Sequence, residues 1–162
     1  MPTPPSLSWV KRSDMLIVAR KLSELHFSAL TEVYGIESLQ KEQDLYAYLR
    51  EELFPRGMCC VWQVQGRYVS ALRLQPWGDG WLLEGLQTHP AHRRNGYGKQ
   101  LVTAVLQQLD LPKVYVHIQR SNAASVSLHL ACGFQKCLPY ATYLDGSVYH
   151  CADTYVYQNP RC

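Results

Sequence analysis

The sequence from Leu86 to Leu101 reads LQTHPAHRRNGYGKQL and places arginines, glycines and a lysine between an expected strand and an expected helix. The first backbone N–H groups of a helix lack internal partners, and the helix dipole makes that end partly positive. Glycine allows a bulky anion to come close to the backbone. We therefore predict a phosphate-binding loop, in which Arg93, Arg94 and Lys99 add positive charge.

Two common phosphate-binding motifs do not fit this loop. A dinucleotide-binding loop needs a third glycine at the position where this sequence has Leu101. A Walker loop needs a glycine and a serine or threonine at the positions of Arg93 and Gln100. The remaining pattern is Arg93-x-x-Gly96-x-Gly98, which predicts another phosphate-bearing ligand.

Three side chains outside the loop carry groups that can do acid–base chemistry, and the choice of these three rests on the family resemblance described below. Glu84 lies on the expected strand before the loop, where alternation would place it on one face with Leu86 and Thr88. His117 lies on a later expected strand, and the usual histidine pKa of about 6.5 suits a base near neutral pH. His129 lies on the next expected helix. Each also has a structural interpretation: an ion-paired or solvated glutamate, a hydrogen-bonded histidine and a packed histidine.

The elements that must position these groups follow from hydrophobic periodicity and turn residues. Helices are expected after a cap at Ser13 or Asp14, with apolar Val18, Leu22, Leu25 and Ala29; around Leu45, Leu49 and Leu53, ending at 55–57; from the loop to about Leu109; and from Ser121 or Asn122 to Gly133. Strands are expected at 7–11, 59–64, 67–74, 82–88 and 114–119, followed by a closing hairpin that turns at 145–146. This order predicts an α/β domain with a mixed sheet.

Length and composition indicate one ordinary globular domain over residues 1–162, with a short flexible lead-in at 1–6. No apolar run reaches the roughly 18 residues of a membrane span, and the first residues lack the pattern of a secretory signal. The net charge of +3 is scattered outside the loop, which favours contact with a few phosphates over a nucleic acid. We therefore expect a cytoplasmic protein with no membrane or nucleic-acid partner.

The cysteines show no spacing typical of a zinc site, so no metal is expected. In a cytoplasmic protein they are most often reduced, buried and small side chains, with a disulfide or a catalytic thiol as alternatives. They are Cys59, Cys60, Cys132, Cys137, Cys151 and Cys162.

The pattern Arg93-x-x-Gly96-x-Gly98 resembles the acyl-CoA pyrophosphate loop, R/Q-x-x-G-x-G/A, of the GNAT superfamily (Gcn5-related N-acetyltransferases). Pro90, which ends the preceding strand, stands three residues before Arg93. The later helix that begins at Asn122 and ends at Gly133-Phe134 is similar to a second motif of this family. The expected order of elements also resembles the family over nearly the whole chain.

The resemblance implies a three-layer fold, with a mixed, mostly antiparallel sheet of six to seven strands and about four helices. It implies an acetyl-CoA-dependent N-acetyltransferase in which a primary amine attacks directly within a ternary complex, with acetyl-CoA as cosubstrate and no metal. The acceptor would be a small-molecule or peptide amine, and the protein a monomer or a homodimer. By the same resemblance, the cofactor would contact Leu86 and Thr88 by their backbone, the side chain of Asn122, and the loop residues Arg93, Arg94, Asn95, Gly96, Tyr97, Gly98 and Lys99.

The resemblance leaves the catalytic roles open. Glu84 stands in a context similar to the strand glutamate of aminoglycoside-type acetyltransferases, and His117 stands where ribosomal-protein-type enzymes carry a glutamate base. His129 replaces the tyrosine that protonates the thiolate in many members, and it is our candidate for this acid. This departure keeps a non-catalytic acyl-CoA-binding module as an alternative, with a protein-interaction domain as a third hypothesis. Trp77, Trp81 and the tyrosines of the closing hairpin either border the acceptor or pack in the core.

Overall fold

The computed structural model of the chain describes residues 14–143 and 145–161. A seven-stranded sheet has the order β1-β2-β3-β4-β5-β9-β6, and a small two-stranded sheet pairs β7 with β8. All neighbouring strands are antiparallel except β4 and β5. The strands are β1 (Asp14–Ala19), β2 (Met58–Val64), β3 (Arg67–Trp77), β4 (Gly80–Thr88), β5 (Lys113–Gln119), β6 (Gln135–Leu138), β7 (Ala141–Thr142), β8 (Val148–Tyr149) and β9 (Ala152–Gln158).

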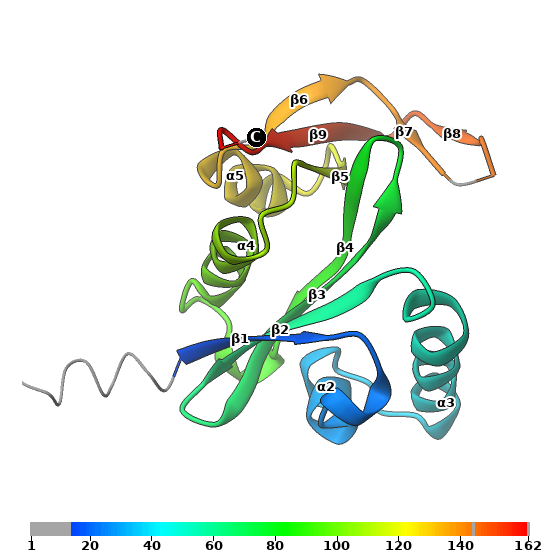
Figure 1. Cartoon of the computed structure of the whole chain (residues 1–162), viewed down its shortest axis with the longest axis vertical. Coiled ribbons are helices and arrows are strands. Elements are labelled where there is room, and N and C mark those ends of the chain that lie inside the picture. Colours follow the sequence, from blue (N-terminus) through cyan, green and yellow to red (C-terminus); the bar gives the residue numbers. More distant parts are fainter. Residues whose placement is uncertain (1–13, 144, 162) are drawn as a thin grey trace, which may run out of the picture.

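Helices cover both faces of the large sheet, which confirms the predicted three-layer α/β fold (Figure 1). Leucines and valines of α4 pack with β3, β5 and the neighbouring strands in the larger core. Side chains of α2 and of the turn after α3 pack on the other face, against β2 and β3. The helices are α2 (Phe27–Val33), α3 (Leu39–Tyr48), α4 (Tyr97–Gln108) and α5 (Ala123–Ala131), with short turns η1 (Leu22–Glu24) and η3 (Pro90–His92) and the π-helical turn η2 (Leu49–Leu53).

The helix expected after Asp14 is wrong, because residues 14–19 form the edge strand β1. The apolar run of residues 15–18 pairs along β2, from Asp14 opposite Val64 to Ala19 opposite Cys59. The i, i+4 spacing of apolar residues is typical of a helix, but the long-range pairing with β2 determined the structure of this segment. The first helix instead begins at Phe27, after His26 accepts a hydrogen bond from the Ala29 N–H at 3.2 Å.

Other expectations about the elements are confirmed. The helix around Leu45, Leu49 and Leu53 is present as α3 and η2, and the strands on either side of residues 65–66 are β2 and β3. The hairpin predicted at Asp145-Gly146 is present as β7 and β8. The predicted strand at 7–11, the possible cap at Ser13 and the lead-in at 1–6 lie outside the described residues.

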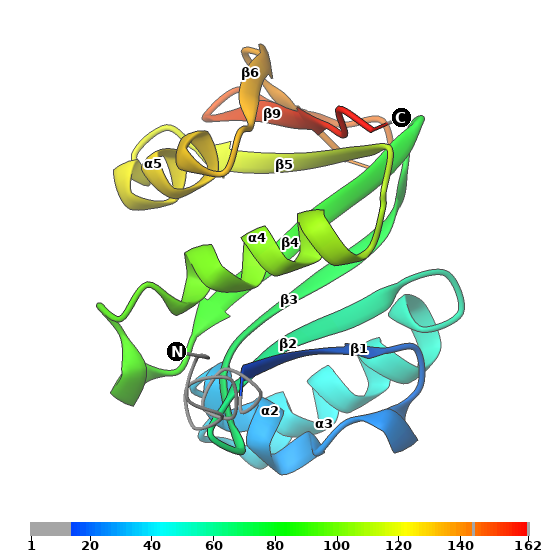
Figure 2. The ribbon, with the colours of Figure 1, turned by 60° about the vertical axis from the view of Figure 1, so that its left-hand side comes forward.

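The two parallel strands of the sheet separate soon after they meet (Figure 2). β4 and β5 pair only at Trp81–Val114, Leu82–Tyr115 and Leu83–Val116. Just beyond, the register between β3 and β4 shifts, and Gly85 adopts a φ of +63°, which favours glycine. This bulge turns the remainder of β4 away from β5, so the edge of β4 that faces β5 has no strand partner after Leu83 among the described residues.

Candidate active site

The predicted phosphate loop forms one end of the site. Gly96 is the residue before α4 and has a left-handed φ of 74°. The N–H groups at the start of α4 have no backbone partner within residues 14–143 and 145–161. They lie beside a cavity of about 350 Å³, lined by Leu86, Gln87, Thr88, Arg93, Arg94, Gly96, Tyr97, Gly98, Lys99, Asn122, Ala124, Ser125 and Leu128. This cavity includes every residue that the sequence predicts for cofactor contact except Asn95.

The geometry of the loop explains its glycines. A Cβ atom at Gly98 would lie 3.3 Å from the Leu128 side chain and 3.5 Å from Thr88 Oγ1, so α4, α5 and β4 approach one another there. A Cβ at Gly96 would meet nothing within 4 Å, so the loop is open at this point. The Asn95 side chain donates to the carbonyl oxygens of His92 and Arg93, at 3.0 and 3.3 Å, which shapes the turn. The open loop, free N–H groups and positive side chains fit a diphosphate.

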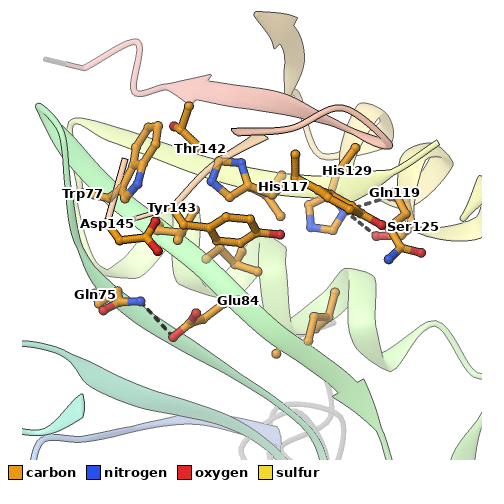
Figure 3. Close-up of a pocket in the computed structure, with 17 residues that line it drawn as sticks. Gln75, Trp77, Glu84, His117, Gln119, Ser125, His129, Thr142, Tyr143 and Asp145 are labelled. Carbon is orange, nitrogen blue, oxygen red and sulfur yellow. Dashed lines mark hydrogen bonds between the residues drawn. The ribbon is translucent and has the colours of Figure 1, made fainter. Parts of the chain in front are cut away.

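A second cavity of about 690 Å³ lies where β4 and β5 separate (Figure 3). It shares Leu86 and Ser125 with the first cavity, so the two are neighbours. All three predicted acid–base residues, Glu84, His117 and His129, line it. Gln75, Trp77, Gln119, Thr142, Tyr143, Asp145 and Tyr149 add polar and aromatic groups to its wall.

Glu84 is held by neighbours that the sequence does not point to. Its Oε1 atom accepts hydrogen bonds from the Tyr48 hydroxyl at 2.7 Å and from Gln75 Nε2 at 3.1 Å. Arg73 Nε lies 3.9 Å from the same oxygen. The Tyr48 hydroxyl has its pKa raised to about 12, first by burial and then by this hydrogen bond, so it stays a donor at neutral pH.

The predicted common face of Glu84, Leu86 and Thr88 is wrong. Glu84 pairs across the sheet with Arg73, on the side of α2 and α3. Leu86 packs into the core beneath α4, and Thr88 Oγ1 faces Gly98 of α4. The bulge inserts an extra residue between them, and strand alternation therefore switches face.

Arg73 packs against this bulge. Its guanidinium lies 5.4 Å from the centre of the Tyr34 ring and 5.3 Å from that of Tyr48. A Cβ atom at Gly85 would lie 2.5 Å from the guanidinium, so any larger residue would force the arginine to move. The arginine thus packs between two aromatic rings and the bulge, with Glu84 beside it.

His117 lines the larger cavity, and its hydrogen bonds determine which ring nitrogen is protonated when the ring is neutral. The Thr154 hydroxyl donates its one proton to the Tyr140 carbonyl oxygen at 2.7 Å, so it can only accept from His117 Nδ1, 2.9 Å away. Nδ1 therefore carries the proton, and Nε2 is buried without a hydrogen-bond partner among the described residues. Burial lowers the pKa of His117, while the nearby backbone of Thr142 and the charge of Glu84 raise it. Trp77 packs edge-on against this imidazole, with ring centres 5.2 Å apart.

His129 is almost completely buried, with 1% of its surface exposed. Its Nδ1 atom lies 2.8 Å from the Ser125 carbonyl oxygen, and its ring packs edge-on against Phe134. Burial lowers its pKa, while the backbone hydrogen bond to Ser125 raises it. The role of His129 as an acid stays a prediction, and it requires the imidazolium form because the single N–H of the neutral ring is already used.

The hairpin β7–β8 supplies the outer wall of the larger cavity. Asp145 accepts hydrogen bonds from the Ser147 hydroxyl at 2.6 Å and from its N–H at 2.8 Å. These bonds lower the pKa of Asp145, which is therefore a carboxylate at neutral pH. Of the aromatic residues expected near the acceptor, Trp77, Tyr143 and Tyr149 line the cavity, whereas Trp81, Tyr155 and Tyr157 pack in the larger core.

No group of three or more histidine, cysteine, aspartate or glutamate side chains within 14–143 and 145–161 is arranged to hold a metal ion. Among the helices in the same ranges, none has the length and apolar character needed to cross a membrane. Cys59 and Cys60 are buried free thiols, and burial raises the pKa of Cys59 to about 12.

Comparison with known proteins adds independent evidence. Residues 20–134 match the family model described as the acetyltransferase (GNAT) family. No curated protein matches the sequence.

Several solved structures share the fold at low sequence identity. The ribosomal-protein-S18-alanine N-acetyltransferase from Escherichia coli is 18% identical, covers 90% of this chain and 94% of its own, and has a TM-score of 0.61. Spermidine N-acetyltransferase from Vibrio cholerae, in complex with CoA and spermine, is 17% identical over 91% of this chain and 96% of its own, with a TM-score of 0.62. The acetyltransferase yncA from Salmonella typhimurium, with acetyl-CoA, is 17% identical over 93% and 96%, with a TM-score of 0.62.

Proposed function

Because this chain belongs to the acetyltransferase (GNAT) family, we propose that it transfers an acetyl group from acetyl-CoA to a primary amine, which attacks directly within a ternary complex. The observation that carries this proposal is the pair of neighbouring cavities that share Leu86 and Ser125. One is lined by the start of α4, whose first N–H groups have no backbone partner in the described chain, and the other by His117, whose Nε2 has no hydrogen-bond partner there. A ligand with a diphosphate at one end and a reactive group at the other fits this arrangement.

The described residues offer contacts to the diphosphate and to the pantetheine arm of acetyl-CoA. The N–H groups of Tyr97, Gly98 and Lys99, together with Arg93 and Arg94, would hold the diphosphate. The free edge of β4 would pair with the amides of the pantetheine arm, as an added strand would. When bound there, the cofactor supplies the acetyl group as an activated thioester.

Of the two candidate bases, the geometry favours His117. Its Nε2 carries a lone pair and has no hydrogen-bond partner within residues 14–143 and 145–161, whereas Glu84 already accepts two hydrogen bonds and lies near Arg73. We assign to Glu84 the attraction and orientation of the ammonium group, and to His117 the removal of its proton. The amine nitrogen forms the new C–N bond, the C–S bond breaks, and the sulfur leaves with the bonding electrons. The nitrogen then loses its second proton, which the thiolate takes up. A thiol pKa of about 8.5 makes this thiolate a fair leaving group.

The wall of the larger cavity suits an amine acceptor. Glu84, Asp145 and the two histidine Nε2 atoms are hydrogen-bond acceptors, and Trp77 and the hairpin tyrosines offer aromatic faces to a cation or an aliphatic chain. Two proteins of similar fold are named as N-acetyltransferases of a ribosomal-protein alanine and of spermidine. The proposed acceptor is therefore a small-molecule or peptide amine, and the proposed enzyme is a cytoplasmic monomer or homodimer without a nucleic-acid partner.

The first test is thermal unfolding with acetyl-CoA, with NAD and ATP as controls. A ligand at about 100 times its dissociation constant adds about 2.7 kcal/mol of stability, which corresponds to a rise in Tm of about 5–10 °C. A rise with acetyl-CoA alone is expected and would justify a screen of amines for CoA release. No rise at millimolar acetyl-CoA would contradict the proposal.

The alternative function is a non-catalytic acyl-CoA-binding module. It is favoured by one observation, the use of the only N–H of neutral His129 in a bond to Ser125, at the position expected for the acid. In that case acetyl-CoA would stabilise the protein, but no amine would release CoA. Release with any amine would exclude this alternative.

A further inference from the structure

His129 lines the larger cavity next to the residues that both cavities share. Leu86 and Ser125 belong to both cavities, and Ser125 is in direct contact with the His129 ring. Figure 3 shows this imidazole beside Ser125 in the wall of the cavity. A cofactor that has its phosphates at the α4 loop would therefore bring its thiol end past this ring.

The hydrogen bonds of His129 determine which nitrogen is protonated. The Ser125 carbonyl oxygen, 2.8 Å from Nδ1, can only accept, so Nδ1 must donate. The neutral ring then has a lone pair at Nε2, and this atom has no hydrogen-bond partner in the described part of the chain. A buried acceptor without a partner is costly, and a ligand that supplies a donor would remove that cost.

We propose that His129 is a binding residue, whose Nε2 accepts a hydrogen bond from a donor at the thiol end of the cofactor arm. This inference rests on the proposed function, because it places acetyl-CoA in the two cavities. Two donors have the required chemistry. The last amide N–H of the arm is present in both acetyl-CoA and CoA, whereas a thiol S–H is present only in CoA. The role differs from that of an acid, since His129 keeps its proton on Nδ1 throughout.

The test compares two variants by isothermal titration with acetyl-CoA and with CoA. In His129→Asn, the amide nitrogen takes the place of Nδ1 and can still donate to Ser125, but nothing replaces Nε2. In His129→Gln, the longer side chain carries its amide to the position of Nε2 and can offer an oxygen there. We expect the Asn variant to bind about tenfold more weakly and the Gln variant to stay within about threefold of the wild type.

The two ligands distinguish the donors. A loss with both acetyl-CoA and CoA assigns the bond to the amide, and a loss with CoA alone assigns it to the thiol. Unchanged binding of both ligands by the Asn variant would overturn the proposal. Failure of the wild type to bind either ligand would instead overturn the proposed function.

A second measurement needs no variant and reads the tautomer directly. Long-range ¹H–¹⁵N spectra of the wild type should show His129 Nε2 unprotonated in the free protein, with a change in its ¹⁵N shift when CoA is added. A protonated Nε2 in the free protein, or a shift that CoA does not change, would contradict the role as an acceptor. This measurement decides the matter even if an amide variant folds poorly.

Discussion

The two ends of the proposed site are built in different ways. At the phosphate end, the groups proposed to bind the diphosphate come from one continuous segment, residues 93–99, and include backbone N–H groups at the start of α4, while β4 and α5 complete the wall of the cavity. The acceptor end draws side chains from β3, β4, β5, α5 and the hairpin β7–β8. A backbone site depends on local conformation, which short-range sequence encodes, whereas a side-chain site depends on which elements meet in space.

The largest expected effect separates these two ends. His117→Ala should lower kcat about 10²- to 10³-fold, because the proposed base is lost, while the Kd for acetyl-CoA stays near that of the wild type. His150→Ala, which removes an exposed histidine, is the control. If Glu84→Gln costs as much kcat as expected here and His117→Ala does not, the base is Glu84.

The pH dependence of the same reaction tests the state of His117. Only neutral imidazole accepts a proton, so kcat/KM should fall as the pH drops through the pKa of His117. Burial lowers that pKa, and the fall should therefore occur below the usual value of about 6.5. A pH–rate profile measures this limb. An acidic limb that persists in His117→Ala would assign it to another group.

The bulge that separates the ends is tested by Gly85→Ala. The substitution places a Cβ against the guanidinium of Arg73, which two tyrosine rings hold in place, at a positive φ that already disfavours alanine. We expect a loss of about 2–3 kcal/mol in the free energy of unfolding. Gly66→Ala is matched to it, because Gly66 has a φ of +77° but nothing within 4 Å of an added Cβ. Urea unfolding measures both variants. Equal losses in their free energies of unfolding would show that the contact with Arg73 does not contribute to the effect at Gly85.

The phosphate end is tested by Arg93→Ala. Loss of one charged contact to the diphosphate should weaken acetyl-CoA binding about tenfold, with kcat at saturation unchanged. Lys41→Ala, an exposed change on α3, removes the same charge away from the loop and should leave the Kd unaltered. Titration calorimetry measures both, and a similar effect of the two variants would indicate only a response to net charge.

The smallest expected effect is on the KM for the amine, when a hydrogen bond to Glu84 is removed. Tyr48→Phe removes the hydroxyl that donates to Glu84 Oε1 at 2.7 Å and should raise the KM for the amine about three- to fivefold. Tyr46→Phe removes a hydroxyl from the same helix and should change nothing. Amine saturation curves provide the comparison, and an unchanged KM in Tyr48→Phe would show that Glu84 is positioned without it.

The chain's first described element shows why sequence reasoning fails where pairing is long-range. Residues 15–18 form a continuous apolar run, and Val18 also begins a series of apolar residues with helical spacing. The segment is a strand because it pairs with β2, more than 40 positions later along the chain. The face of Glu84 is a similar case. Alternation is a sound rule for a regular strand, but β4 has a bulge at Gly85, where its register with β3 shifts and Arg73 packs against it.

By itself, the sequence determined the α/β layers, the phosphate loop and the identities of Glu84, His117 and His129 as chemical candidates. These depend on local periodicity, on glycine positions and on side-chain chemistry, which are properties of short segments. Tertiary structure alone decided which nitrogen of His117 is protonated, because its decisive partners, Thr154 and Tyr140, lie on other segments of the chain. It also decided the cluster of Arg73, Tyr48 and Gln75 around Glu84, because hydrogen bonds and packing between distant segments exist only once the chain has folded.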